Sequence, residues 1–298
     1  MKYQQTISSL NLKQSKATIM ILEAAIGDAY GAGFEFRDLD FISKNNNLTQ
    51  YDKHGMYTEI YKKYTDDTQM AIAIPELLLE DDNWNEIKVA DKFVEVFHRD
   101  KRRGYSDRVY NALDASKNGS DFIKIIDNGS SGNGSAMRAY SIGHLKDIKQ
   151  ILEFCEIQAK TSHNTVEGIS CAKRIALAVH YFKYNLGDGS TLIDFLNQTL
   201  KENENYRITS PIDMHGYPTT QAVIKMVSEG VSMKDCLKTG IGYGGDTDTV
   251  AALSMAILSQ KQNCEKTLPL FLYEELENDK FGKDFLIKLD LALNNKFS

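Results

Sequence analysis

The chain has 298 residues, of which 42% are hydrophobic and 26% charged, with a formal net charge of −6 at pH 7. This composition is typical of a globular protein with a large core, and the acidic balance argues against a broad surface for specific nucleic-acid binding. No run approaches about 18 apolar residues, so we expect no membrane contact. Residues 1–20 lack the pattern of a secretion signal. The four cysteines have no C-x-x-C spacing, so we expect free thiols and a cytoplasmic protein.

Apolar residues recur at intervals of three and four along the chain, and alternating apolar and polar runs are scarce, which predicts an all-α protein. The first predicted helix, over residues 17–29, is apolar nearly all round and therefore central. Its small residues would let another helix or a ligand come close, and the glycines of residues 31–33 end it. Residues 37–63 are polar and irregular, which is typical of loops.

The second predicted helix begins at Thr65 and continues to about Glu80, with Pro75 expected to kink it or to start a second segment. The turn-rich stretch 128–135 leads into another predicted helix at Ala136. Further helices are predicted at about 86–98, 109–113, 146–160, 165–184, 191–201, 218–229, 233–239 and 250–258, with one or two more across 268–293. With no internal repeat and no linker rich in Pro, Ser or Gly, we expect a single domain over residues 1–298.

The predicted helix at 250–258 follows Gly244–Gly245–Asp246–Thr247–Asp248–Thr249. Acidic and hydroxyl residues stabilise helix N-termini, but one capping residue is enough and this stretch supplies four. The glycines allow backbone conformations that bring several oxygens to one point. Oxygen ligands at close spacing suit a hard cation such as Mg²⁺ or Mn²⁺. The alternative is that these residues form a helix cap with more polar side chains than it needs, or a solvated turn.

The segment Thr65–Asp66–Asp67 opens its helix in the same way. If the two helix starts met, their four carboxylates would repel one another and could not all stay ionised unaided. Two divalent cations would balance their charge, and Thr65 and Thr249 would add neutral oxygens. The alternative is that the two starts lie on opposite faces and only cap their helices.

Three other segments could carry chemistry. Asp28 is favoured as a buried acceptor at a helix end, whereas Glu35 either reaches a water or substrate hydroxyl or is a solvated surface residue. The small residues of 132–138 could cradle phosphate, with Arg138 as a nearby cation; a plain flexible loop is the alternative. His163 lies between two predicted helices, where a lone histidine more often caps or packs.

Together these segments resemble the ADP-ribosylglycohydrolase family, which includes the dinitrogenase-reductase-activating glycohydrolases and the ADP-ribosyl-acceptor hydrolases. The resemblance rests on motifs in the family's order: GDAYGAGFE (27–35), YTDDTQMA (64–71), GNGSAMR (132–138), TSHNTVEG (161–168) and GGDTDTVAA (244–252). It implies a compact all-helical fold with a binuclear Mg²⁺ or Mn²⁺ centre in a central cleft. The implied metal ligands are Thr65, Asp66, Asp67, Asp246, Asp248 and Thr249.

The resemblance also implies roles for the remaining segments. Glu35 would be a base or gate near the metal pair, with Asp66 and Asp67 as rival proton acceptors. The residues implied to bind the diphosphate and adjoining ribose, or to line the same cleft, are Gly132, Asn133, Gly134, Ser135, Met137, Arg138 and His163. Gly104, Tyr105 and Ser106 resemble part of an R-G-Y-G loop that packs against the ligand, although Ser106 replaces the last glycine of that loop.

The implied activity is metal-dependent hydrolysis of the glycosidic bond between ADP-ribose and an acceptor, which is an ADP-ribosylated protein or a small conjugate. Two alternatives stay open: hydrolysis of another ADP-ribose derivative, such as a nucleobase-linked one, and a catalytically silent relative that binds ADP-ribose. A monomer is expected. The acceptor depends on the cleft rim at 37–56, 99–107 and 211–220, and the sequence of these loops shows no decipherable preference.

Overall fold

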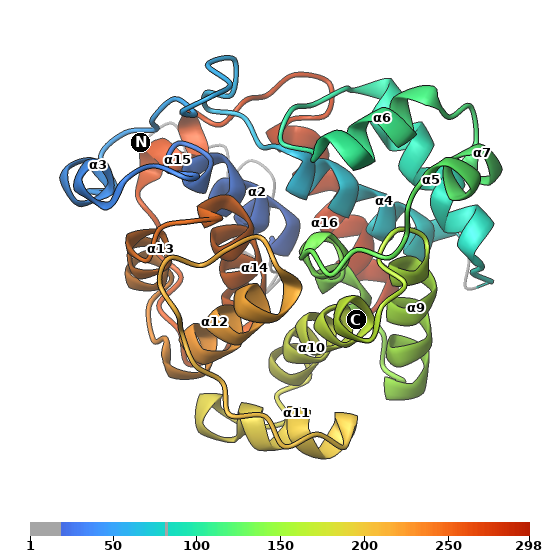
Figure 1. Ribbon diagram of the computed structural model, residues 1–298. Helices are drawn as coiled ribbons and strands as arrows, with labels where there is room; N and C mark the ends of the chain where they lie inside the picture. Colours follow the sequence, from blue (N-terminus) through green and yellow to red (C-terminus); the bar gives the residue numbers. More distant parts are fainter. Residues whose placement is uncertain (1–18, 81–82) are drawn as a thin grey trace.

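Helices form the framework of the protein in a computed structural model that describes residues 19–80 and 83–298. Over these residues there is no strand and there are four isolated β-bridges, which confirms the all-α prediction. The start of the first predicted helix, residues 17 and 18, lies outside the described residues. In chain order the elements are α2 (Met20–Gly31), α3 (Leu39–Asn45), α4 (Asp66–Glu80), α5 (Glu86–Arg99), α6 (Asp107–Ala115), α7 (Gly119–Ile125), α8 (Gly134–Met137), η1 (Tyr140–His144), α9 (Ile148–Lys160), α10 (Val166–Lys183), η2 (Gly189–Thr191), α11 (Leu192–Leu200), α12 (Gly216–Glu229), α13 (Met233–Gly242), α14 (Thr247–Gln260), α15 (Leu270–Glu274) and α16 (Lys283–Lys296) (Figure 1).

Helices α2 and α14 form the centre of the molecule, and every residue of both is buried. They lie side by side (Figure 1) because two glycines of α2 face the backbone of α14. A Cβ on Gly27 would lie 2.6 Å from the carbonyl oxygen of Ala251, and one on Gly31 would lie 2.5 Å from that of Thr247. The end of α2 is therefore held against the start of α14.

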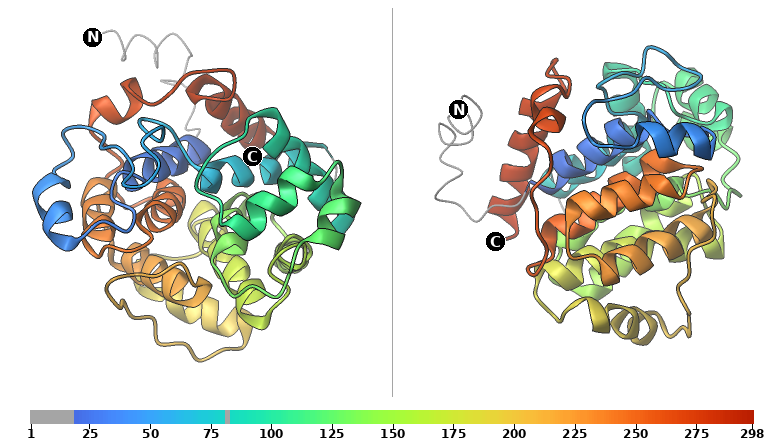
Figure 2. Two further views of the ribbon diagram at one scale, coloured as in Figure 1. Left: turned by 45° about the horizontal axis from the view of Figure 1, so that its top comes forward. Right: turned by 90° about the vertical axis from the view of Figure 1, so that its left-hand side faces the viewer.

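Two helix N-termini are capped by side chains from other helices. Asp290 of α16 accepts hydrogen bonds from two backbone nitrogens in the first turn of α2 at 2.9 and 3.1 Å. Asp28 of α2 accepts from the backbone nitrogens of Thr65 and Thr68, both at 3.0 Å, and from the Thr68 hydroxyl at 2.6 Å. The role expected for Asp28 is confirmed. Helix α16 packs against both α2 and α4 (Figure 2), so these caps tie three helices together.

Some element boundaries differ from the prediction. Helix α4 continues through Pro75, so no second segment begins there. Residues 37–63 were expected to be loops, but α3 lies within them; it buries only Ile42 and therefore shows no apolar periodicity. Helix α7 was also missed, because it has seven residues and begins at a glycine. The predicted C-terminal stretch forms two helices, α15 and α16.

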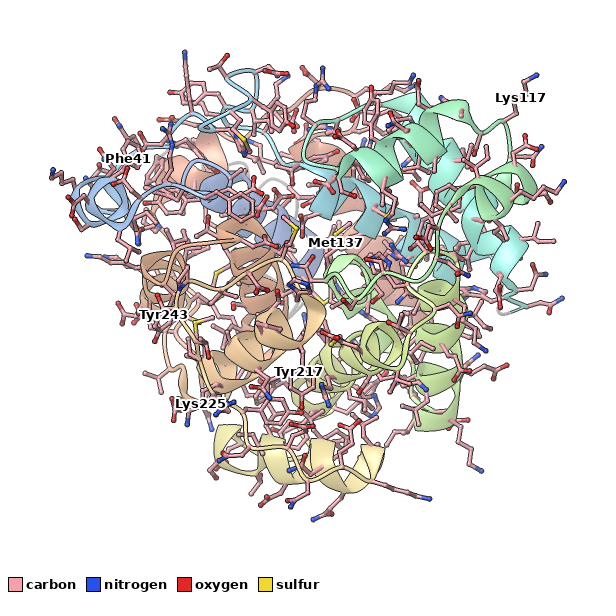
Figure 3. The ribbon with its side chains drawn as sticks, in the orientation of Figure 1. Phe41, Lys117, Met137, Tyr217, Lys225 and Tyr243 are labelled. Carbon is pink, nitrogen blue, oxygen red and sulfur yellow. The ribbon has the colours of Figure 1, made fainter. Side chains whose placement is uncertain are left out.

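Several segments that are distant in the sequence meet on one face of the molecule. They are the turn after α2, the starts of α4 and α14, the loop before α6, and α8. Met137, at the end of α8, lies near the middle of the face turned to the viewer in Figure 3. Among the helices described, none is both long and apolar enough to cross a membrane.

Candidate active site

A cavity of about 440 Å³ opens where these segments meet. Its lining includes five carboxylates, from Glu35, Asp66, Asp67, Asp246 and Asp248, together with the hydroxyl-bearing Thr249. The two acidic helix starts, one on α4 and one on α14, therefore face the same space. The alternative in which they lie on opposite faces of the protein is wrong.

Of the acidic side chains at these helix starts, Asp248 accepts a hydrogen bond from a backbone nitrogen of its own helix, that of Thr249 at 2.9 Å. Asp246 precedes α14 but makes no capping bond through its side chain; its Oδ2 instead accepts from Nδ2 of Asn133 at 2.6 Å. The start of α4 is capped by Asp28. Oδ1 of Asp67 is buried and has no hydrogen-bond partner among the described residues. A buried carboxylate oxygen without a donor is unfavourable unless something else, such as a cation, compensates for it.

The arrangement of the carboxylates fits a divalent cation. Glu35, Asp246 and Asp248 each offer one oxygen, and these three oxygens lie within 4.8 Å of one another. Asp67, whose buried Oδ1 has no partner among the described residues, lines the same cavity. A set made only of oxygens suits Mg²⁺ or Mn²⁺ rather than a softer metal. Glu35, expected as a base or gate, thus also lies among the groups that could hold a metal.

The pKa values of these carboxyl groups reflect their crowding. Burial raises the pKa of Asp66, Asp67 and Asp248 well above the ordinary range, and repulsion from the neighbouring carboxylates raises them further. Burial also raises the pKa of Glu35, although a hydrogen bond with His54 opposes the shift. Such a cluster retains protons unless a cation supplies positive charge. The site is therefore built to bind positive charge.

The loop before α6 reaches the cavity through Gly104. This residue has a φ of +114°, in a region that favours glycine. A Cβ added there would lie 2.0 Å from Oδ1 of Asp66, so the glycine lets the loop pack directly on this carboxylate. Tyr105 is buried and its hydroxyl donates to Oε1 of Gln69 at 2.8 Å, which fixes the loop to α4. Ser106 is exposed at the start of α6.

Most residues expected to bind substrate line this same cavity: Gly104, Tyr105, Ser106, Gly132, Asn133, Gly134, Met137, Arg138 and His163. Ser135 is not among the lining residues; it is fully buried and its hydroxyl donates to the carbonyl oxygen of Gly168 at 2.7 Å. Thr65, expected as a metal ligand, is not among the residues that line the cavity, although its neighbour Asp66 is. Thr65 is 1% exposed, and its hydroxyl oxygen accepts from the backbone nitrogen of Asp67 at 3.3 Å.

One neighbour of the acidic cluster, His54, was missed in the sequence. Its Nε2 lies 2.6 Å from Oε2 of Glu35, while its Nδ1 accepts from the backbone nitrogens of Met56 and Tyr57 at 3.0 Å each. Because Nδ1 accepts, Nε2 carries the ring proton and donates a hydrogen bond to Oε2 of Glu35. A single histidine in an irregular polar stretch offers no periodicity or motif. Other lining residues outside the motifs are Phe36, Met56, Tyr57, Asp107, Arg108, Val109, Ser130 and Met214.

These features define an all-helical protein with an acidic cavity suited to divalent cations. The sequence profile of the ADP-ribosylglycohydrolase family matches residues 9–292, and the chain belongs to this family. Among curated proteins, it is 26% identical to ADP-ribosylhydrolase ARH3 of Xenopus tropicalis, over 90% of this chain and 93% of that protein. It is 28% identical to ADP-ribosylhydrolase ARH3 of Homo sapiens, over 78% of this chain and 82% of that protein.

A solved structure titled "ADP-ribosylglycohydrolase-related protein complex" has the same fold. The TM-score is 0.70 with 18% sequence identity, and the match covers 94% of this chain and 96% of the other. At this identity the likeness concerns the fold. It agrees with the family assignment and with the compact helical architecture expected from the sequence.

Proposed function

We propose that the protein is a metal-dependent hydrolase that cleaves the glycosidic bond between ADP-ribose and an acceptor and releases ADP-ribose. Membership of the ADP-ribosylglycohydrolase family, and relatives named ADP-ribosylhydrolases, support hydrolysis of an ADP-ribose compound. The strongest support for the proposal is that Glu35 and both acidic helix starts line one cavity. The buried Oδ1 of Asp67, which has no donor among the described residues, supports the binding of a cation in this cavity.

The residues that would hold two divalent cations are Asp66, Asp67, Asp246, Asp248 and Thr249, with Glu35 beside them and Thr65 behind. When bound, the cations would offset the negative charge, orient ribose hydroxyl groups and make a water molecule more acidic. Asn133 steadies Asp246 by donating to its Oδ2. Gly104 keeps the loop before α6 in contact with Asp66. The protein's part is thus to keep the acidic oxygens close together in a fixed arrangement.

Glu35 is the proposed acceptor for the proton of the attacking water. Its side chain is 15% exposed, at the cavity wall, and one of its oxygens is oriented by the N–H group of His54. Its carboxylate also offers an oxygen within 4.8 Å of oxygens of Asp246 and Asp248, so it lies close enough to accept a proton from a water held between them. As the acceptor leaves, positive charge develops on the ribose, and the surrounding carboxylates would stabilise it. Asp66 and Asp67 are the rival proton acceptors.

The proposed position of the rest of the substrate follows from the other walls of the cavity. The small residues of the segment 132–138, which includes α8, and His163 would receive the diphosphate and the adjoining ribose. The exposed side chains of Phe36 and Met56, together with Tyr57, lie at the wall near Glu35 and would face the acceptor. This orientation follows from placing the reacting bond beside Glu35.

The test is a panel of arginine-linked, serine-linked and nucleobase-linked ADP-ribose incubated with the protein and Mg²⁺ or Mn²⁺. Chromatography would measure released ADP-ribose. We expect release from at least one linkage, its loss with a chelator, and loss of most of the rate in Glu35→Gln with cation binding retained. No release from any linkage, while free ADP-ribose still binds, would identify the chain as a silent binder instead.

A further inference from the structure

Arg138, which sequence reasoning placed next to phosphate, makes its hydrogen bonds inside the protein. It is 1% exposed. Its Nε donates to Oε1 of Gln158 at 2.6 Å, and Nη2 donates to the carbonyl oxygen of Gln158 at 3.0 Å and to Oγ of Ser162 at 2.8 Å. Nη1 lies 3.0 Å from the sulfur of Met70, and the Phe93 ring covers one face of the guanidinium. Each guanidinium nitrogen therefore has a partner within the protein.

The Ser162 hydroxyl connects Arg138 to His163. Its Oγ lies 2.9 Å from Nδ1 of His163, and the serine is 1% exposed. A guanidinium can only donate hydrogen bonds, so it occupies a lone pair of the hydroxyl and leaves the hydroxyl proton available. If His163 donated from Nδ1 instead, the hydroxyl proton of Ser162 would be buried without an acceptor among the described residues, which is unfavourable. The hydroxyl of Ser162 therefore donates to Nδ1.

This arrangement decides which nitrogen of His163 carries a proton. A neutral imidazole has one N–H group, so an accepting Nδ1 places the proton on Nε2. Burial, together with the nearby Arg138 and Arg108, lowers the pKa of His163 well below its usual value, so the ring is neutral at pH 7. His163 lines the cavity, and its Nε2 has no partner in the part of the chain that the structure describes.

The loop carrying the proposed phosphate contacts lies directly against this ring. A Cβ on Gly134 would be 2.7 Å from Cε1 and 3.0 Å from Nε2 of His163. Gln158, the other partner of Arg138, donates from Nε2 to the carbonyl oxygen of Ser135 at 2.9 Å. Arg138 is thus linked through Gln158 to Ser135 and through Ser162 to the ring of His163.

We propose that Arg138 and Ser162 are positioning residues that keep His163 in its Nε2–H form, as a hydrogen-bond donor to a phosphate oxygen of the bound ADP-ribose. The identity of the ligand rests on the proposed function. An arginine suits this position because it has no acceptor atom, whereas glutamine would let the Ser162 hydroxyl turn away from His163. Lysine has no acceptor either, but it lacks the planar group that reaches Gln158 and Ser162 together.

The test compares tautomers and ligand affinity in matched variants. Nitrogen-15 NMR of the ligand-free protein reports which ring nitrogen is protonated, and the His163→Gln spectrum assigns the signal among the six histidines. We expect an unprotonated Nδ1 in the wild type, and a mixture of both forms in Ser162→Ala with about tenfold weaker ADP-ribose binding by calorimetry. Ser162→Thr, which restores a hydroxyl, should restore both properties. Ser141→Ala, at a buried serine outside the cavity lining, should change neither.

Two results would overturn the inference: a proton on Nδ1 in the wild type, or a Ser162→Ala protein with unchanged tautomer and affinity. Arg138→Gln provides a second variant, expected to shift the tautomer in the same direction as Ser162→Ala. The tautomer measurement needs no ligand. A wild type with the expected tautomer and its Ser162 dependence, but no affinity for ADP-ribose, would support the hydrogen-bond chain and refute the phosphate contact, whereas the proposed function is tested separately by the release of ADP-ribose.

Discussion

Replacing Gly31 with alanine tests whether the contact between α2 and α14 sets the position of the acidic cluster. A Cβ at this position would lie 2.5 Å from the carbonyl oxygen of Thr247 and 2.6 Å from Cα of Asp248. Ordinary carbon–oxygen contacts are about 3.3 Å or longer, so the two helices must separate by roughly 0.8 Å. Overpacking of this kind lowers the free energy of unfolding by about 1–3 kcal/mol.

The same displacement acts on the cation site. Distances in metal sites tolerate changes of only about 0.2 Å, and the Cβ would press on Asp248 itself. We therefore expect Gly31→Ala to weaken binding of Mg²⁺ or Mn²⁺ by about tenfold or more. Isothermal titration calorimetry measures the affinity, and urea denaturation measures the stability.

Gly27→Ala is the matched control. Its Cβ would lie 2.6 Å from the carbonyl oxygen of Ala251, so the clash is similar but is one helical turn further from the cavity. We expect a comparable loss of stability with a smaller loss of cation affinity. If Gly31→Ala lost stability yet bound cations as the wild type does, or if Gly27→Ala lost as much affinity, the contact between α2 and α14 at Gly31 would not set the position of the acidic cluster.

Three further predictions concern buried groups. Burial raises the pKa of Asp290 to about 8. The folded protein therefore holds the proton of this carboxyl group more tightly than the unfolded chain does. The free energy of unfolding should then fall as pH rises from about 4 to 8, by up to about 1.4 kcal/mol per pH unit. Asp290→Asn should flatten this part of the profile of melting temperature against pH. An unchanged slope would show that protonation of Asp290 does not contribute to stability. Asp28→Asn replaces an acceptor of four short contacts to Thr65 and Thr68 and should lower the free energy of unfolding in urea by about 1–3 kcal/mol; a wild-type midpoint would contradict the capping role. His54→Ala should lower kcat about tenfold by releasing Glu35, and His54→Gln should recover part of it; a change in KM alone would argue against orientation of Glu35 by His54.

The sequence was informative where the signal is local. Long helices such as α5 show their buried face as a repeat of apolar residues, and the acidic residues that line the cavity lie in short contiguous motifs. Short helices carry too few buried positions for such a repeat, which is why α3 was missed within 37–63. Boundaries also depend on packing, as shown by the continuation of α4 through Pro75.

The candidate site was less accessible to sequence reasoning, because its decisive contacts are long-range. Whether Asp66 and Asp67 cap α4 or face a ligand depends on Asp28, which is 37 positions from Thr65 and supplies the cap from another helix. The link from His54 to Glu35 joins a loop of irregular sequence to a motif. Composition and spacing do not reveal such pairs, because they form only when distant segments come together in the folded chain.

The acidic starts of α4 and α14 are proposed to hold divalent cations together. Crystals of the protein grown with Mn²⁺, with data collected at the manganese absorption edge, would show whether they do. We expect two anomalous peaks in the cavity, within about 2.0–2.6 Å of carboxylate oxygens from both Asp66–Asp67 and Asp246–Asp248. An empty cavity at saturating Mn²⁺, or peaks bound only elsewhere on the protein, would contradict it.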